Sequence, residues 1–316
     1  MPNVYFFANG QADGSGQMKD ILGGKGASLH EMTKLGIPVP PGFTIAASLC
    51  TQYLTDRKLP EELCTEVTAA MGRLESATGR GFGDSTAPLL VAVRSGAKVS
   101  MPGMMDTILN LGLNDQTAAA LAEQTGNPRF AYDSYRRFVQ MYAHVVPGIG
   151  RGNGRDPIDD AIEKAKFRRN VDREIDLDVG DLQDLVRTMQ DIIERETGVP
   201  FPQDPWDQLW RSVEAVFQSW NARRARDYRR LHRIPHDLGT AVNVVAMVFG
   251  NMGEDSATGV VFTRDPSTGE PRLFGEYLVN AQGEDVVAGV RTPEPIDAMA
   301  DTLPRVLDEL RTTCST

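Results

Sequence analysis

The chain has 316 residues, of which 41% are hydrophobic, and it carries a net charge of -10. This is long and apolar enough for two or three domains with buried cores. The acidic balance excludes a general nucleic-acid surface but allows a local basic pocket for a phosphorylated molecule. The apolar run at 241–249 is far shorter than the roughly 20 residues of a membrane span, and the N-terminus lacks the basic start of a signal peptide. We therefore expect a cytoplasmic protein with no membrane partner.

The first part of the chain alternates between strand and helix patterns. "VYFFA" predicts a strand, and the apolar spacing that follows predicts a helix that begins after Gly23 and Gly24 and stops at Gly36. The prolines of "IPVPPGFTI" exclude a helix and predict a turn into a strand that ends near Ala46. Helices at 47–77 and the strand "LLVAVRSGA" complete this part.

In the rest of the chain, the predicted secondary structure changes twice, first to helices and then to strands. Apolar residues at three and four spacing predict a helical insertion at 113–200, with "VPGIGRGNGRDP" as a surface loop. One further helix, "DQLWRSVEAVFQSWNARRARDYRRL", lies within 201–240. The segment 241–316 begins with the β-rich run "AVNVVAMVF". It continues with two or three strands and a turn at 265–269, and ends in a helix.

The motif "GGKG" at 23–26 is the first candidate for chemistry. Its glycines let backbone amides approach a ligand, the helix behind them points its positive end at the same place, and Lys25 adds a cation. The motif lacks the glycine spacing of a Walker loop. Taken alone, the motif favours the alternative, which is a glycine turn before a helix with a solvated lysine.

Arg94 and the loop behind it form the second candidate. A guanidinium presents a permanently charged fork that fits phosphate oxygens, and "SGAKVSMPGMMDT" supplies small residues whose amides and hydroxyls can surround an anion. The loop is therefore expected to close over a phosphate. The alternative is a hairpin loop whose methionines fill the core.

Other charged residues give weaker signals. Arg137 in "RFAYDSYRRF" reads by itself as a surface or ion-pair arginine, and "RRARDYRR" at 223–230 as a solvated helix face. The four histidines lie in no metal-like spacing, so we propose neither a metal site nor a nucleophilic histidine from the sequence.

Several long segments in a fixed order resemble the N-terminal nucleotide-binding domain of the pyruvate, phosphate dikinase family. They are "GGKGASL", "VRSGAKVSMPGMMDTILNLGLND", "TGNPRFAYDSYRRFVQMY", "GTAVNVVAMVFGN" and "TGVVFTRDPSTGE" with "GEYLVNAQGEDVVAGVRTPEPI". The resemblance runs from about residue 20 to 296. Phosphoenolpyruvate synthases share "GGKGASL" and "VVFTRDPSTG", but their arginine segment typically continues differently.

The resemblance implies an α+β, ATP-grasp-like fold of two lobes that close on ATP. Its parts would be a first lobe at 1–112, a helical insertion at 113–200, a helix returning to the first lobe at 201–240 and an incomplete second lobe at 241–316. It also implies the conversion of ATP, phosphate and pyruvate to AMP, diphosphate and phosphoenolpyruvate through a phosphohistidine on another domain. Positioning and charge neutralisation do nearly all the catalysis in such phosphoryl transfer.

The resemblance also assigns the site residues. Lys25 and Arg94 would contact the triphosphate, with Arg94 also the catalytic residue, and Arg137 would support the same site. The adenine would lie against the apolar strand near 246–248, and the loop would cover the phosphates. The residues assigned to the loop and the adenine contact are Ser100, Met101, Gly103, Met104, Asp106, Thr107, Ala246, Met247 and Val248.

The family's Asp-x-Glu magnesium ligands, Gln-x-Arg triphosphate contacts, phosphohistidine motif and pyruvate-binding barrel do not occur in these residues. We therefore expect a piece of a longer, homodimeric enzyme whose Mg²⁺ ligands and partner domains lie outside this sequence. An unpaired sheet edge is expected near Val286 and Val287. The alternatives are a non-catalytic module that binds a nucleotide or a partner, and a fragment of a phosphoenolpyruvate synthase-like dikinase. A helical scaffold without a ligand fits the small residues around two cations poorly.

Overall fold

The computed structural model describes residues 2–152, 154–288 and 291–315. Residue contacts divide the chain into two compact units, Met1–Met247 and Val248–Thr316. Helices and antiparallel sheets occur in both units, which confirms the expected α+β class. None of the described helices is both long and apolar enough to cross a membrane.

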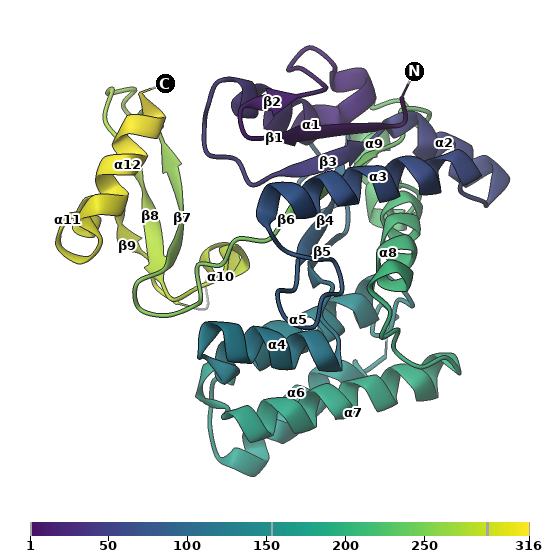
Figure 1. Ribbon diagram of the computed structural model, residues 1–316, viewed down its shortest axis with the longest axis vertical. Coiled ribbons are helices and arrows are strands. Elements are labelled where there is room, and N and C mark those ends of the chain that lie inside the picture. Colours follow the sequence, from purple (N-terminus) through teal and green to yellow (C-terminus); the bar gives the residue numbers. More distant parts are fainter. Residues whose placement is uncertain (1, 153, 289–290, 316) are drawn as a thin grey trace. The chain divides into compact units, whose positions relative to one another are not determined.

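The first unit is built on a six-stranded sheet with the order β2-β1-β3-β6-β4-β5, in which neighbouring strands are antiparallel (Figure 1). Its strands are β1 (Val4–Ala8), β2 (Gln11–Ala12), β3 (Gly42–Ile45), β4 (Val91–Gly96), β5 (Thr107–Leu111) and β6 (Ala241–Ala246). The sequence predicted β1, β3 and β4. Of the two interpretations of the Gly- and Met-rich loop, only the hairpin alternative implied β5, which follows this loop and returns beside β4.

Helices cover this sheet. Nearly every residue of β1, β3, β4 and β6 is buried, as expected where both faces of a sheet are packed rather than one. The packing helices are α1 (Lys19–Lys34), α2 (Ala47–Asp56), α3 (Glu61–Thr78), α5 (Pro128–Val145) and α8 (Pro205–Ser219). Glycines in the left-handed region at 36 and 79 follow the ends of α1 and α3, so the predicted stop at Gly36 is confirmed.

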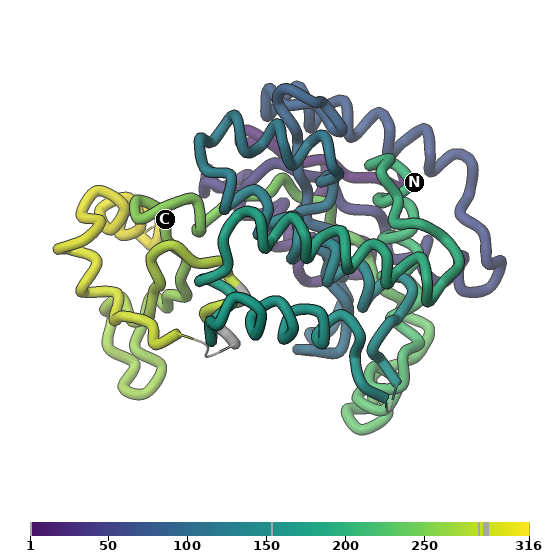
Figure 2. Tube along the Cα trace, turned by 90° about the horizontal axis from the view of Figure 1, so that it is seen from below, coloured from purple at the N-terminus to yellow at the C-terminus, as the bar shows by residue number. Residues whose placement is uncertain are grey.

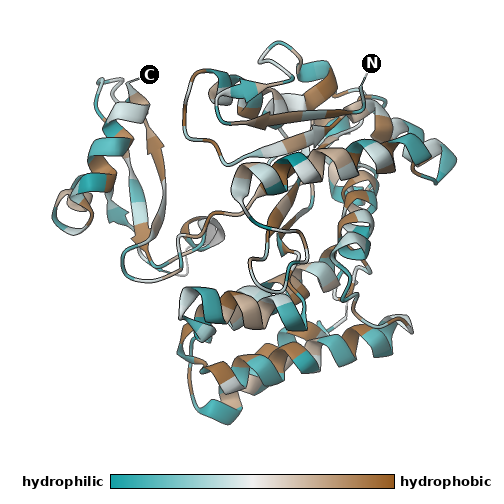
Figure 3. Cartoon of the chain, in the orientation of Figure 1, coloured by the Kyte–Doolittle hydropathy of each residue, from teal (hydrophilic) through white to brown (hydrophobic). Residues whose placement is uncertain are grey.

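Four helices form the predicted helical part, and they pack side by side in the teal region of Figure 2. They are α4 (Asp115–Thr125), α5 (Pro128–Val145), α6 (Pro157–Arg169) and α7 (Val179–Thr197), with the short η1 (Glu174–Asp176) before α7. Hydrophobic and hydrophilic segments alternate along α7 (Figure 3), because its apolar residues recur at helical spacing and face the other helices. The rings of Phe138, Tyr142 and Phe201 pack together at the centre.

The predicted single helix within 201–240 is two helices, α8 and α9 (Arg223–Leu231). Side-chain interactions stabilise the break between them. The indole of Trp220 is buried against the guanidinium of Arg229, 3.9 Å from the ring centre, and Arg229 donates to the carbonyl of Trp220. The basic run therefore contains one fully buried arginine, which a solvated helix face does not explain.

The second unit holds a three-stranded antiparallel sheet, β7-β8-β9. Its elements are β7 (Ala257–Phe262), β8 (Phe274–Val279), α10 (Gly283–Ala288), β9 (Glu294–Pro295), η2 (Ile296–Ala298), α11 (Met299–Thr302) and α12 (Pro304–Cys314). Tyr277, Ile296, Met299 and Leu307 form its core. The predicted turn is present, because Asp265 accepts hydrogen bonds from the amides of Ser267 and Thr268.

Two expectations about this region differ from the structure. The second part of the chain was expected to begin at 241, but β6 pairs with β3 and β4 in the first sheet, and the division between the units falls after Met247. The apolar pattern of 241–249 predicts a buried strand. It does not show which sheet the strand joins, because its pairing partners are distant in sequence. Val286 and Val287 were expected at a sheet edge, but this segment is α10.

Candidate functional site

A close approach of two glycines organises the candidate site. Gly23 interrupts α1 with φ 68° and ψ 175°, and the helix resumes behind it. A Cβ at Gly23 would lie 1.6 Å from the carbonyl oxygen of Gly96, so no side chain fits there. The amide of Gly24 donates to the carbonyl of Ala97 at 2.9 Å. The resumed helix therefore begins directly against the end of β4.

This junction brings Lys25 and Arg94 into electrostatic contact. Lys25 lies in the first turn after the kink, and Arg94 is the one exposed residue of β4, between Asn243 on β6 and Thr107 on β5. Burial lowers the pKa of Lys25 from its ordinary value, and the positive charge of Arg94 lowers that pKa further. Burial also lowers the pKa of Arg94. Both side chains keep access to solvent despite this desolvation.

Neither cation has a carboxylate partner among the described residues, whereas neighbouring Lys98 forms an ion pair with Asp20. An uncompensated pair of like charges raises the free energy of the site. An anion placed between Lys25 and Arg94 would remove that repulsion. The predicted convergence of these two residues is therefore consistent with the structure.

The loop between β4 and β5 is only partly packed. Ser100, Pro102 and Gly103 are exposed, Met104 and Met105 are half-buried, and Met101 is buried. The core-filler alternative required all three methionines in the core, so it explains only one of them. The mobility of the loop stays a prediction.

The far end of the loop is fixed by Asp106, whose carboxylate is buried and accepts hydrogen bonds from Arg151 at 2.7 Å and from Arg224. Arg224 also donates to the carbonyl of Met104. The sequence assigned Asp106 to the nucleotide, but in the structure its carboxylate anchors the loop. Both arginines are remote in sequence, so no local pattern could reveal them. Thr107 lies beside Arg94 as its partner on β5.

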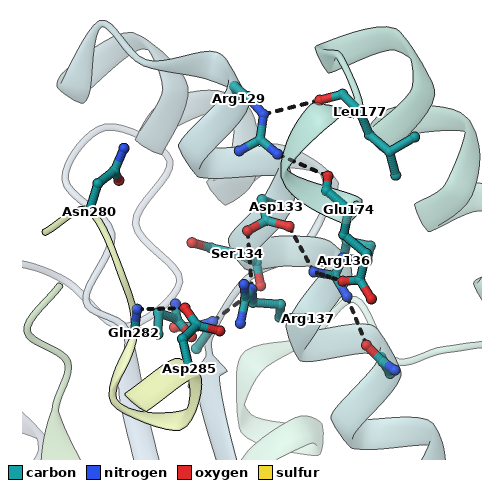
Figure 4. Close-up of polar contacts among 12 residues, drawn as sticks. Arg129, Asp133, Ser134, Arg136, Arg137, Glu174, Leu177, Asn280, Gln282 and Asp285 are labelled. Atoms are coloured by element: carbon teal, nitrogen blue, oxygen red, sulfur yellow. Dashed lines mark hydrogen bonds and ion pairs between the residues drawn. The ribbon is translucent and has the colours of Figure 1, made fainter. Parts of the chain in front are cut away.

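Arg137 lies on α5, and its Nε donates to Asp133 at 3.1 Å (Figure 4). Asp133 also accepts from the buried Arg136 at 2.8 Å. The described contacts do not join Arg137 to Lys25 or Arg94. The spacing of Asp133 from the two arginines, three and four positions along a helix, is a signal that sequence reasoning could have used.

The segment assigned to adenine contains the last residue of the first unit and the first residue of the second. Ala246 is buried at the end of β6, and the amide of Met247 donates to the carbonyl of Leu90 at 2.9 Å. Val248 is 71% exposed. An accessible apolar side chain beside an ordered strand end suits a flat apolar ring, but the adenine contact stays a prediction.

One cluster of possible metal-ligand side chains was not visible from the spacing of the histidines. His144, Asp156 and Asp159 present ligand atoms within 4.8 Å of one another. Protein partners account for all three, however. Asp156 caps α6 through the amide of Ile158 and lies 2.8 Å from His144, and Gln140 donates to Asp159. The cluster therefore carries no metal assignment.

Comparison with known proteins defines the family. The family model described as "Pyruvate phosphate dikinase, AMP/ATP-binding domain" matches residues 19–73 and 51–313. The chain belongs to this family. The pyruvate, phosphate dikinase of Rhizobium meliloti (strain 1021) is 54% identical over 94% of this chain, and that of Clostridium symbiosum is 52% identical over 95%. Pyruvate, phosphate dikinase 2 of Zea mays is 51% identical over 98%.

The matched region is only part of those dikinases. This chain covers 33%, 34% and 35% of the Rhizobium, Clostridium and Zea proteins, respectively. It therefore spans about a third of the length of the curated relatives it matches. The resemblance read from the sequence motifs is confirmed at the level of the dikinase nucleotide-binding domain.

Proposed function

We propose that this chain binds ATP as the nucleotide-binding portion of a pyruvate, phosphate dikinase, with the triphosphate held by Lys25 and Arg94. The observation that carries the proposal is the pairing of these two cations at the glycine junction without a carboxylate partner among the described residues. A triphosphate would supply the missing negative charge. The guanidinium of Arg94 offers bidentate hydrogen bonds, and the ammonium of Lys25 acts as a compact second cation.

The neighbouring elements have complementary roles in this proposal. The exposed residues of the loop, Ser100 and Gly103, offer a hydroxyl and a backbone amide to the phosphates, while Asp106 holds the far end of the loop in place. Arg137 adds a third cation. We infer an ATP-grasp arrangement, in which the adenine contacts the strand end at 246–248.

Magnesium does not fit the residues that surround the two cations. Mg²⁺ requires oxygen ligands, usually carboxylates, and in the described part of the chain no carboxylate pairs with Lys25 or Arg94. These residues are suited to phosphate oxygens rather than to a metal ion. We therefore propose no Mg²⁺ ligand among the residues around Lys25 and Arg94 and derive no step through the ion.

In the whole enzyme, the proposed reaction converts ATP, phosphate and pyruvate to AMP, diphosphate and phosphoenolpyruvate through a phosphohistidine on another domain. The contribution of this chain is to position the triphosphate and to neutralise its charge, which supplies most of the catalysis in phosphoryl transfer. This chain holds one side of that apparatus, so it is expected to bind nucleotide weakly and to form no phosphoenolpyruvate by itself.

Titration with ATP and with adenosine tests the proposal. Replacing Arg94 by Ala removes a charge-assisted contact of about 1.5–3 kcal/mol and should weaken ATP binding about 10- to 100-fold. Adenosine binding should stay unchanged. Arg73→Ala is the matched control, because Arg73 is also accessible but lies on α3 and forms an ion pair with Asp13, which follows β2. Equal losses for ATP and adenosine in Arg94→Ala would refute the assignment.

A further inference from the structure

Asp133 on α5 uses both carboxylate oxygens to hold two consecutive arginines. Its Oδ1 accepts from Arg136 at 2.8 Å, and its Oδ2 accepts from the Nε of Arg137 at 3.1 Å (Figure 4). The two arginines differ in exposure. The side chain of Arg136 is 2% exposed, and that of Arg137 is 19% exposed. Only Arg137 therefore keeps appreciable access to solvent.

A second set of contacts prevents Asp133 and Arg136 from rotating. Arg136 also forms an ion pair with the carboxylate of Glu174 at 2.9 Å and donates to Gln140 at 2.8 Å. Arg129 donates to the carbonyls of Glu174 and Leu177, which fixes the segment that carries Glu174. The contacts of Arg136 with Glu174 and Gln140 thus hold Arg136 in place, and Arg136 in turn fixes the position of the Asp133 carboxylate.

The charge of Asp133 is maintained by the same contacts. Burial alone would raise the pKa of this carboxyl, but Arg136 and Arg137 outweigh burial and lower the pKa to about 2. Asp133 is therefore ionised under any condition in which the protein is assayed, and its hydrogen bond to Arg137 is charge-assisted.

The connection to Arg137 is not needed to join α5 to η1. Arg136 already links Asp133 to Glu174, and Arg129 links α5 to the same segment. What the Asp133–Arg137 contact adds is orientation. An arginine held through Nε has its guanidinium plane fixed, and its two terminal nitrogens then point along one edge. Fixing this edge before a ligand arrives reduces the ordering cost of binding.

We propose that Asp133 is a positioning residue that aims the guanidinium of Arg137 at the triphosphate, with Arg136 as the buried cation that holds Asp133 in place. The inference rests on the proposed function, in which Arg137 contacts the nucleotide. It assigns Asp133 no contact with ATP itself, because both of its oxygens are already occupied by arginines.

A double-mutant cycle on the 316-residue chain tests this role. ATP and adenosine affinities are measured by NMR titration up to millimolar ligand for the wild type, Asp133→Asn, Arg137→Ala and the double variant. Asp133→Asn should weaken ATP binding about 10-fold, equivalent to about 1.4 kcal/mol, and leave adenosine binding unchanged. In the Arg137→Ala background the same substitution should have no further effect. Asp184→Asn, which also removes an acid paired with an arginine three positions along its helix, should change nothing.

The outcomes separate this inference from the proposed function. Equal losses of ATP affinity with and without Arg137, or no loss at all, would overturn the positioning role while leaving ATP binding intact. A wild-type chain that does not bind ATP would overturn both. If Asp133→Asn does not fold, NMR of the wild-type chain still tests the contact between Asp133 and Arg137. The Nε–H signal of Arg137, assigned by its loss in Arg137→Ala, should exchange slowly with solvent, and rapid exchange would refute the contact.

Discussion

The glycine junction predicts a large and specific effect for Gly23→Ala. The new methyl group would lie 1.6 Å from the oxygen and 2.4 Å from the carbon of the Gly96 carbonyl, and both are backbone atoms that cannot rotate away. Forcing them apart costs about 1–3 kcal/mol. The backbone of Gly23, with φ 68° and ψ 175°, adds about 1–3 kcal/mol for any other residue. We expect a total loss of about 2–6 kcal/mol.

Two glycines serve as matched controls. Gly36 has φ 79° but open space around it, so Gly36→Ala should cost only the backbone term, about 1–2 kcal/mol. Gly24 has no positive φ, and its Cβ would meet the Ala97 carbonyl at an ordinary 3.5 Å, so Gly24→Ala should be close to neutral.

Urea unfolding followed by tryptophan fluorescence measures these differences in the first unit alone, because all three tryptophans lie there. Gly23→Ala should be the least stable of the three variants. If it retains stability by separating the kink from β4, Lys25 and Arg94 separate too, and ATP affinity falls instead. A variant as stable as Gly24→Ala that also binds ATP normally would refute the close approach.

Three further predictions concern other residues. Burial lowers the pKa of His30 to about 4, below the unfolded value of 6.5, so its neutral form should stabilise the fold by about 3 kcal/mol above pH 6.5. This contribution should be lost as the pH falls to about 4, and an imidazole that titrates near 6.5 by NMR would contradict it. Asp106→Asn should release the loop and speed amide exchange at 100–105, and unchanged exchange would argue against the anchor. Cys64 is exposed whereas burial raises the pKa of Cys50 to about 12, so a thiol reagent should label Cys64 rapidly and Cys50 only on unfolding.

Local patterns predicted most of the helices and several strands because their causes are local. Apolar spacing marks α4 to α7, and Gly36 ends α1 at the expected place. The pattern failed where a tertiary contact decides the structure. The break between α8 and α9 depends on the stacking of Trp220 and Arg229, and β5 depends on pairing with β4.

The candidate site divides in the same way. Lys25 and Arg94 are recognisable from the sequence because Lys25 follows a glycine pair and Arg94 comes shortly before Gly96. Such glycines are a local sign of close backbone approach. The anchors of the loop are not recognisable, because Arg151 and Arg224 reach Asp106 from distant parts of the chain. The orientation of Arg137 falls between these cases, since Asp133 and Arg136 lie within one helical turn of it but Glu174, which holds Arg136, is remote in sequence.

The place of β6 in the first sheet has a consequence for biosynthesis. This strand lies at the centre, between β3 and β4, yet it is the last of the six to leave the ribosome. Until residue 246 emerges, β3 and β4 each have one edge that lacks its native partner, and such edges can pair with other chains. While the helical part is being synthesised, β2-β1-β3 and β4-β5 are therefore two incomplete sheets, each with an edge open to pairing with other chains. Completion of this sheet depends on its last strand, and stalled translation before that point would favour aggregation.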